Sequence, residues 1–224
     1  MDGNGRWAEM RGLPRIEGHK RGAERTREVI AAASEVGVNT LTLYAFSLEN
    51  WQRPGEEVSM LMKLLEHYLK KEFNELIKGG IVFRTIGEIW RLPENIQALL
   101  KDAEKKSLHN TGMNLVLALS YSGRNEIMRA VKKALDAGVM PEDVTEAYFA
   151  SLLDTSGLPA PDLIVRTSGE KRISNFLLWQ AAYAELYFTD TLWPDFTREE
   201  FFFALHDYQM RERRFGAVHA RAER

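Results

Sequence analysis

The sequence Leu163-Ile164-Val165-Arg166-Thr167-Ser168-Gly169 joins three apolar residues to a polar, glycine-containing stretch that continues to Asn175. The apolar run is typical of a buried strand, and the polar residues after it would form a loop at its carboxyl end. Ligands of open α/β sheets collect at the carboxyl ends of strands. Arg166 and Arg172 carry guanidinium groups, whose fork matches phosphate oxygens. This stretch alone leaves two interpretations open, a solvated loop and a site for a charged oxyanion.

Outward from this strand, segments with helical and strand patterns alternate along the chain. Short apolar strands separated by helices indicate a mainly parallel sheet covered by helices on both faces. We therefore expect an α/β fold, with one domain over residues 1–224 and a central sheet of about six strands flanked by helices. The patterns predict helices at residues 22–36, 56–78, 93–109, 123–137, 145–153 and 198–212, and strands at 41–46, 81–86, 115–119, 163–165 and 186–188.

The composition excludes several classes of function. The formal net charge of −2 gives no electrostatic case for nucleic-acid binding, which usually needs a strongly basic face. The chain has no cysteine, so disulfides, thiolate metal sites and cysteine nucleophiles are excluded. No apolar run reaches the roughly 18 residues of a membrane span. We expect a soluble protein. Any phosphate binding would depend on locally placed cations.

The amino end carries a second polar cluster, Asp2-Gly3-Asn4-Gly5-Arg6-Trp7-Ala8. Its glycines fit the loose dinucleotide-binding pattern, but that pattern must follow a strand and open an uninterrupted helix, and Gly12 and Pro14 interrupt the segment after it. A glycine-rich loop can also wrap a diphosphate with backbone N–H groups while a carboxylate holds Mg²⁺. Arg15 and His19 would add positive charge there. The remaining alternative is a plain turn at a terminus.

A third cluster, Ser47-Leu48-Glu49-Asn50-Trp51-Gln52-Arg53-Pro54, follows the predicted strand that ends at Phe46. Hydroxyl, carboxylate, amide and guanidinium groups at the carboxyl end of a strand are suited to a second wall of a ligand site. Surface loops also carry such residues without any function. The indole of Trp51 is unusual in a polar loop unless it packs against another group.

Taken together, these clusters resemble the signature motifs of the cis-prenyltransferase family, in particular the bacterial enzymes that make undecaprenyl diphosphate. The segments Gly18-His19, Phe176-Leu177-Leu178-Trp179-Gln180, Leu192-Trp193-Pro194-Asp195-Phe196 and Arg211-Glu212-Arg213-Arg214-Phe215-Gly216 continue the match. The resemblance covers nearly the whole chain, and its motifs are long and ordered. It implies a Mg²⁺-dependent enzyme that condenses isopentenyl diphosphate onto an allylic starter, namely farnesyl diphosphate.

The resemblance also implies a role for each motif. Asp2 matches an aspartate that holds Mg²⁺ and assists the departing allylic diphosphate, and Glu185 matches a second metal-site carboxylate. Asn50 occupies the position proposed to accept a proton, but an amide is a poor base, so we expect it to orient the substrate or a water. The implied allylic site contains Gly3, Asn4, Gly5, Arg6, Trp7, Arg15 and His19. The segment that closes over the substrates contains Ser47, Leu48, Glu49, Trp51 and Arg53. The implied isopentenyl site contains Arg166, Arg172, Ile173 and Ser174, and Arg214 and Gly216 join it across a homodimer interface.

The growing chain needs an apolar space. The stripe from Val58 to Leu76, with Leu41, Leu43 and Ala45, is expected to line a hydrophobic tunnel between helix and sheet, although most such side chains in proteins are ordinary core. In the resembling family a small residue at the position of Ala45 accompanies long products. The implied product is a long polyprenyl diphosphate, the lipid-carrier precursor for cell-wall glycans, made in the cytoplasm with peripheral contact at the inner face of the membrane.

Three alternatives and one departure accompany this interpretation. A non-catalytic partner subunit of the same fold would not need Asp2 and Arg6, and a dinucleotide-binding oxidoreductase is disfavoured by the interrupted helix. The all-helical trans-prenyltransferases use paired aspartate-rich motifs that this chain lacks. Members of the resembling family have a strand just before the Asp2 motif, and the given chain starts inside that motif, so we expect a first strand to be missing from it.

Overall fold

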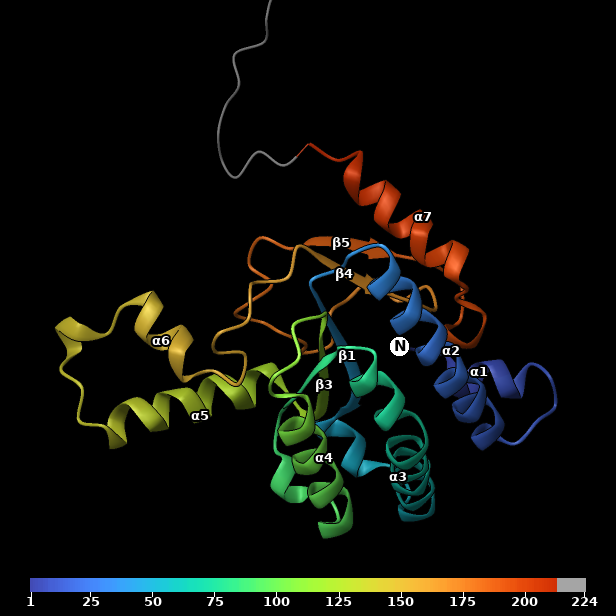
Figure 1. Cartoon of the computed structure of the whole chain (residues 1–224), viewed down its shortest axis with the longest axis horizontal. Coiled ribbons are helices and arrows are strands. Elements are labelled where there is room, and N and C mark those ends of the chain that lie inside the picture. Colours follow the sequence, from blue (N-terminus) through green and yellow to red (C-terminus); the bar gives the residue numbers. More distant parts are fainter. Residues whose placement is uncertain (213–224) are drawn as a thin grey trace, which may run out of the picture.

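The computed structural model describes residues 1–212, in which helices and strands alternate as the sequence predicts (Figure 1). Helices α2 to α7 and all five strands confirm predicted elements, most of them with bounds within two residues of the prediction. One helix, Asn4–Glu9, was expected to be a loop. The helices are α1 (Asn4–Glu9), α2 (Arg15–Glu35), α3 (Gly55–Lys78), α4 (Glu94–Ser107), α5 (Gly123–Asp136), α6 (Glu146–Leu152) and α7 (Arg198–Gln209), and the strands are β1 (Thr40–Ser47), β2 (Val82–Ile86), β3 (Asn114–Tyr121), β4 (Leu163–Arg166) and β5 (Glu185–Phe188).

The strands form two parallel sheets rather than one. The first has the order β1-β3-β2, with Leu43 opposite Leu117 and Phe83 opposite Leu115. The second contains β4 and β5 alone, with Leu163 opposite Glu185. The predicted parallel α/β class is confirmed, but the single sheet of about six strands is wrong for residues 1–212. The physical reason is that β1 and β4, which are edge strands of their sheets, do not pair with each other, and a gap of about 360 Å³ is lined by residues of both.

Strand β3 lies at the centre of the larger sheet and separates two clusters of apolar side chains. Leu115, Leu117 and Leu119 pack into the main core with α2, α3 and α4. Their neighbours Val116 and Ala118 point to the opposite face, because successive residues of a strand alternate in direction. The opposite face is covered by Leu158, Phe176 and Leu177, which come from loops and not from the helical layer that the sequence predicted there.

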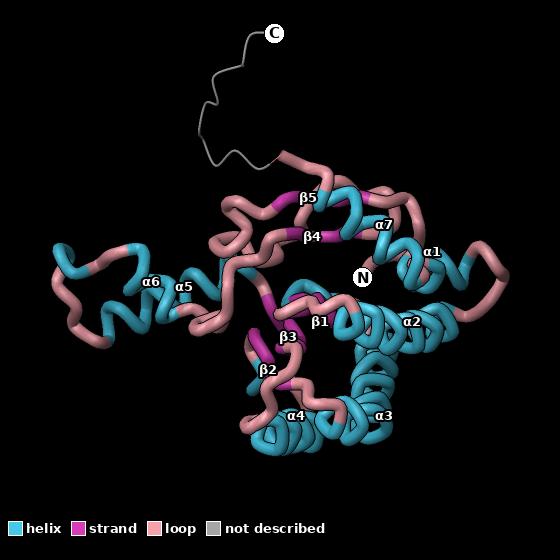
Figure 2. The backbone as a smooth tube through the Cα atoms, turned by 45° about the horizontal axis from the view of Figure 1, so that its top comes forward, coloured by secondary structure: helices cyan, strands magenta, loops and turns pink. Residues whose placement is uncertain are grey.

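The smaller sheet lies beside the amino-terminal helices, whereas α5 and α6 form an arm that leaves the body of the molecule (Figures 1 and 2). Helix α5 exposes several large apolar side chains along this arm, and so does the connection to α6. The exposed set is Met128, Val131, Leu135, Met140 and Val144. Among residues 1–212, no helix has both the length and the apolar character that crossing a bilayer requires.

The first two helices pack together unusually closely. A Cβ atom on Gly18 would lie 1.8 Å from the backbone oxygen of Asn4, and one on Gly22 would lie 2.3 Å from the Asn4 side-chain oxygen. Gly3 initiates α1 with φ of 100°, a backbone conformation that side chains other than hydrogen disfavour. Residues 15–22 of α2 therefore form a rigid support for the motif that begins at Asp2.

Replacing Gly18 tests this support. Gly18→Ala should lower the free energy of unfolding by roughly 1–3 kcal/mol, because the new methyl group collides with backbone that cannot move independently. Gly55→Ala is the matched control, since nothing lies within 4 Å of the position its Cβ would take. Urea unfolding of both variants measures the difference. Equal stability of the two variants would contradict the close packing of α1 on α2.

Candidate active site

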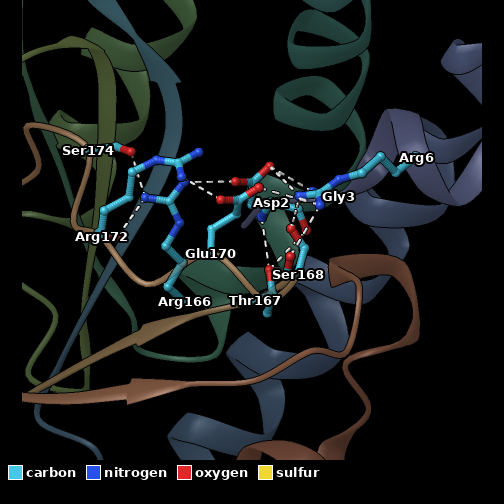
Figure 3. A network of polar contacts seen from close by, with 9 residues as sticks. All are labelled: Asp2, Gly3, Arg6, Arg166, Thr167, Ser168, Glu170, Arg172 and Ser174. Carbon is cyan, nitrogen blue, oxygen red and sulfur yellow. Dashed lines mark hydrogen bonds and ion pairs between the residues drawn. The ribbon is translucent and has the colours of Figure 1, made fainter.

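The motif at Asp2 is fixed to the loop that follows β4, although the two lie far apart in the sequence. The backbone N–H of Asp2 donates to the Thr167 hydroxyl at 2.9 Å, and the same hydroxyl donates to the Asp2 carbonyl oxygen at 2.9 Å. The Trp193 N–H donates to that carbonyl as well, also at 2.9 Å. Thr167 is fully buried. The two polar clusters that the sequence singled out separately therefore form one site (Figure 3).

The carboxylate of Asp2 makes an ion pair with Arg166. The Arg166 Nη2 donates to Asp2 Oδ2 at 2.9 Å, and the Gly3 N–H donates to Asp2 Oδ1 at 2.8 Å. Partial burial by itself would raise the pKa of Asp2, but the hydrogen bonds from Arg166 and Gly3 outweigh it and hold that pKa below its usual value. Asp2 is thus an anion at neutral pH, and its side chain keeps 42% of its surface exposed.

Arg166 also reaches into the other half of the loop. Its Nη1 donates to the Ser174 hydroxyl and to the Arg172 carbonyl oxygen, each at 2.5 Å. Glu170 lies between two cations, with Arg6 Nη1 at 3.5 Å from one of its oxygens and Arg172 paired to the other. Arg6 is held further by the backbone oxygen of Ser168 at 3.2 Å. Glu170 was not among the predicted site residues, although it stands inside the motif that carries Arg166.

A second group of cations meets at one carboxylate of α3. Glu57 Oε1 lies 3.0 Å from Arg53 Nη1, 3.7 Å from Arg15 Nη2 and 3.9 Å from His19 Nε2. Arg15 also pairs with Glu9 at 2.5 Å. Glu57 was not predicted as a site residue. The sequence held no clear signal for it, because Arg53 precedes α3 and Arg15 and His19 come from α2.

His19 does not add the positive charge that its place in the sequence led us to expect. Burial, followed by the nearby Arg53, lowers the pKa of His19 below its usual value, and Glu57 only partly opposes this. The imidazole is therefore neutral at pH 7. Its Nε2 and the Asn4 Oδ1 are buried and have no hydrogen-bond partner within residues 1–212.

The two residues that carry these unpartnered atoms line a cavity. Asn4, His19 and Ala45 border a space of about 140 Å³ between α2, α3 and the larger sheet, whose other walls are mostly apolar. Leu61 and Leu65 of α3 contribute to it as the sequence predicted, whereas Leu41 and Leu43 line the gap between the sheets instead. Within the described part of the chain, the predicted continuous tunnel is not found.

The segment after β1 is a short 3₁₀ helix, Leu48–Gln52. Asn50 Oδ1 accepts the backbone N–H of Ser47 at 3.1 Å, which fixes the start of this helix. The Trp51 indole donates to the Ser120 hydroxyl at 2.8 Å, and its ring packs edge-on against Phe46 at 5.0 Å. Trp51 therefore does pack against other groups. Glu49 approaches the loop after β4 through Asn175, at 2.9 Å.

Several predicted residues lie elsewhere or outside the described chain. Glu185 begins β5, opposite Leu163 and at the other end of the small sheet from Arg166, and its carboxylate accepts from Arg211 at 2.9 Å. The structure therefore does not bring Glu185 to Asp2 within one chain. Over residues 1–212, no three histidine, cysteine or acidic side chains come together as metal ligands. Arg214 and Gly216 lie outside the described residues.

The structure also gives the contacts of two further predicted residues, Trp7 and Ile173, whose proposed roles in substrate binding stay predictions. The Trp7 indole donates to Asp195 Oδ1 at 2.8 Å, and the guanidinium carbon of Arg11 lies 4.3 Å above the Trp7 ring. The Ile173 carbonyl accepts the Phe176 N–H at 3.1 Å and so shapes the loop after β4.

The geometry defines a class of site. The two ion-pair groups described above contain five arginines, and each arginine is paired with a carboxylate of the same chain. Guanidinium groups bind diphosphate oxygens in bidentate fashion, and the cavity beside them has a polar end and apolar walls. Such a site is suited to a diphosphate whose organic part is apolar. The arginines are Arg6, Arg15, Arg53, Arg166 and Arg172.

Comparison with known proteins agrees with this class. The family described as putative undecaprenyl diphosphate synthase matches residues 1–216. An isoprenyl transferase of Aquifex aeolicus is 52% identical, with 97% of this chain and 94% of that protein covered. An isoprenyl transferase of Rhizobium meliloti is 49% identical, with 97% and 90% covered. The chain belongs to this family of cis-prenyltransferases, also called isoprenyl transferases.

Solved structures of the family share the fold. A lavandulyl diphosphate synthase from Lavandula x intermedia, solved in complex with dimethylallyl diphosphate, superposes with a TM-score of 0.93 at 39% identity, covering 96% of this chain and 95% of the other. A probable undecaprenyl diphosphate synthase from Campylobacter jejuni gives 0.78 at 34% identity, covering 88% and 92%.

The Asp2–Arg166 pair generates a prediction about ionisation. Arg166→Met should raise the pKa of Asp2, because it removes the hydrogen bond and the charge that favour the carboxylate while burial remains. Since the pKa of Asp2 is depressed in the folded protein, its contribution to stability is present at neutral pH and is lost as pH falls through that pKa. A carbon-detected NMR titration of the carboxyl group measures the shift. Arg172→Met is the control, and an equal pKa of Asp2 in both variants would refute the assignment.

Proposed function

We propose that this protein joins isopentenyl diphosphate to an allylic diphosphate, with farnesyl diphosphate as the starter, and extends it to a long cis-polyprenyl diphosphate. The observation that carries the proposal is the contact of Asp2 with Arg166 at 2.9 Å, because it joins the two predicted diphosphate sites. Family membership and the isoprenyl transferases named above support the reaction class. The substrates and product length are our inference.

The reaction needs a leaving group to be neutralised and two substrates to be held in line. The bond between the allylic carbon and its diphosphate oxygen breaks, the double bond of isopentenyl diphosphate attacks that carbon, and a proton is then lost. Charge develops on the departing oxygens, so cations aimed at them stabilise the transition state most. Arg6, Arg15 and Arg53 would serve the allylic diphosphate, and Arg166 and Arg172 would serve the isopentenyl diphosphate.

The residues present fit the binding of Mg²⁺ together with substrate. Mg²⁺ is commonly held by one or two carboxylates plus substrate phosphates, and Asp2 is a half-buried, ionised carboxylate paired with Arg166. When bound, the ion would supply positive charge to the leaving diphosphate. Glu185 stays a predicted second ligand. Asn50 has its amide oxygen engaged with Ser47, which supports a role in orienting substrate rather than in taking the proton.

The apolar part of the allylic substrate would occupy the cavity between α2, α3 and the larger sheet. Its volume of about 140 Å³ is below the roughly 300–1,000 Å³ of usual ligand pockets. A long product therefore requires this cavity to widen as the chain grows. The exposed position of Ala45 in the cavity wall supports a role in setting how far the chain extends.

The exposed apolar side chains of α5 and its connection to α6 support a homodimer, because a surface of this kind is normally covered. The predicted Arg214 and Gly216 would then reach the isopentenyl site of the partner. We also propose that the enzyme acts in the cytoplasm, touches the membrane only to release its lipid product, and supplies the carrier precursor for cell-wall glycans.

Product analysis tests the function directly. The protein is incubated with Mg²⁺, farnesyl diphosphate and radiolabelled isopentenyl diphosphate, and the products are separated by chromatography. A ladder that ends in a long cis-polyprenyl diphosphate is expected. No incorporation by folded protein would favour the alternative, a non-catalytic lipid-binding partner subunit.

Removing the Asp2 carboxylate should affect turnover more than any other single substitution proposed here. Asp2→Ala should reduce turnover roughly 10²- to 10³-fold or more while much of the allylic binding survives, because the lost charge acts mainly in the transition state. Asp102→Ala, which removes an exposed carboxylate of α4 that pairs with Lys106, should retain normal turnover. Steady-state kinetics with both substrates decide the matter, and near-normal turnover of Asp2→Ala would exclude the proposed role.

The cavity wall should set product length. Ala45→Leu is expected to shift the product ladder to shorter chains, because the larger side chain fills part of the space beside Leu61 and Leu65. Ala45→Ser, which stays small, should leave the ladder unchanged. Reversed-phase chromatography of dephosphorylated products measures the distribution. An unchanged ladder in Ala45→Leu would place the growing chain elsewhere.

A further inference from the structure

The loop after β4 has an unusual backbone. Four of its non-glycine residues, Ser168, Ser174, Asn175 and Leu177, have positive φ angles of 74°, 47°, 61° and 46°. Such angles are uncommon outside glycine and are kept only where the surroundings enforce them. Asparagine tolerates this conformation better than most residues. The loop is therefore held in one shape by specific contacts, and Asn175 lies at their centre.

Asn175 makes contacts with two other elements. Its Nδ2 donates to Glu49 Oε1 at 2.9 Å and to the Ser122 hydroxyl at 2.5 Å. Its Oδ1 accepts the backbone N–H of Arg124 at 2.9 Å, and its carbonyl oxygen accepts the Gly123 N–H at 2.7 Å. One amide thus joins the 3₁₀ segment after β1, the start of α5 and the loop that carries Ser174.

The neighbours of Asn175 fix it in place from both sides. The Phe176 ring stacks on Tyr44 of β1, with centroids 4.5 Å apart and planes at 14°. On the other side, Ser174 accepts the guanidinium of Arg166 at 2.5 Å, and Arg166 holds Asp2. A displacement of Asn175 would therefore shift both Glu49 and the hydroxyl of Ser174.

We propose that Asn175 is a positioning residue that ties the closing segment, residues 47–53, to the loop of Ser174, so that the wall of the isopentenyl diphosphate site is assembled before that substrate arrives. This inference rests on the proposed function for its kinetic consequences, but the structural tie itself does not. Neither family resemblance nor sequence spacing had assigned Asn175 a role.

The chemistry of the contact explains why asparagine suits this position. The amide supplies two donors, for Glu49 and Ser122, and one acceptor, for Arg124, which an alanine or serine could not replace. Aspartate keeps the shape and the acceptor but loses both donors. It would also place a second negative charge beside Glu49.

Glu49 faces groups from each surrounding element. Burial would raise the pKa of Glu49, but the amide of Asn175 and the hydroxyls of Ser47 and Ser122 hold it below its usual value. Tyr44 also faces Glu49, and burial together with that carboxylate raises the pKa of the phenol. Tyr44 therefore stays neutral, and Glu49 is ionised at pH 7.

The first variant is Asn175→Asp. It should raise KM for isopentenyl diphosphate roughly tenfold or more, because the Ser174 wall is displaced, and raise KM for farnesyl diphosphate less, because the tied segment carries Arg53 but neither Arg6 nor Arg15. Two adjacent carboxylates raise one pKa of the pair. Lowering the pH should therefore add a proton to the pair and restore a hydrogen bond. The KM of the variant for isopentenyl diphosphate should then approach that of the wild type.

Asn125→Asp is the matched control. Asn125 also donates its amide to a carboxylate, Glu88 at 3.2 Å, and accepts from Arg129 at 2.9 Å, but neither of these contacts involves the loop after β4. It controls for a general loss of stability from the same substitution. It should leave both KM values and the pH profile unchanged.

The double variant Glu49→Gln with Asn175→Asp reverses the polarity of the contact. A glutamine amide can donate to the new aspartate. Asn175→Asp should therefore raise KM for isopentenyl diphosphate much less in the Glu49→Gln background than in the wild type. If Asn175→Asp raises KM for isopentenyl diphosphate equally in the two backgrounds, and that increase does not change with pH, Asn175 is only a structural residue of its own loop.

Hydrogen exchange without substrate separates this inference from the proposed function. Asn175→Asp should increase amide exchange across residues 47–53, and the double variant should reverse that increase, whether or not the protein transfers prenyl groups. Unchanged exchange in that segment would overturn the tie. An inactive wild-type protein with the expected exchange pattern would refute the function and leave the tie intact.

Discussion

The docking of Asp2 on the loop after β4 is the contact on which the site depends. Over residues 1–212 the two sheets share no strand pairing, and a gap separates β1 from β4. Asp2 crosses from the α1–α2 unit to the small sheet through two hydrogen bonds with the buried Thr167 and an ion pair with Arg166. A threonine hydroxyl that both accepts and donates fixes the backbone in one place, so the carboxylate is presented in a defined position and not on a loose terminus.

The site is neutralised by its own carboxylates. Asp2 and Glu170 form ion pairs with Arg6, Arg166 and Arg172. Glu57 forms ion pairs with Arg15 and Arg53. In the proposed function, a diphosphate would therefore replace these carboxylates as a partner of the arginines rather than enter an empty cationic pocket. Because the same guanidinium groups also hold these loops, substrate binding would exchange ion-pair partners within a wall that Asn175 keeps assembled.

Local sequence patterns predicted most of this fold, because the apolar periodicity of β3, α3 and α4 is determined by residues close together in the chain. Residues 4–9 were expected to be a loop because two glycines lie nearby, but Gly3 with its positive φ starts a helix that packs on Gly18. The division into two sheets depends on distant edges and has no local signal. Long motifs that resemble a family singled out Asp2, Arg166 and Ser174, and the structure brings these three residues together; their roles stay predictions. Glu57, Glu170 and Asn175 were missed because their roles arise from partners that only the folded chain brings near. The lowered pKa of His19 was missed for the same reason.

The central claim is that Asp2 and Arg166 act as one unit joining the amino-terminal motif to the small sheet. A double-mutant cycle with Asp2→Asn, Arg166→Met and the combined variant, measured as the free energy of urea unfolding, tests it most directly. Because the Asp2 side chain is 42% exposed, a modest coupling of roughly 0.5–1 kcal/mol is expected. The account predicts that the combined variant loses less stability than the sum of the single variants by that amount. Additive losses would show that the two residues act independently and would contradict the account.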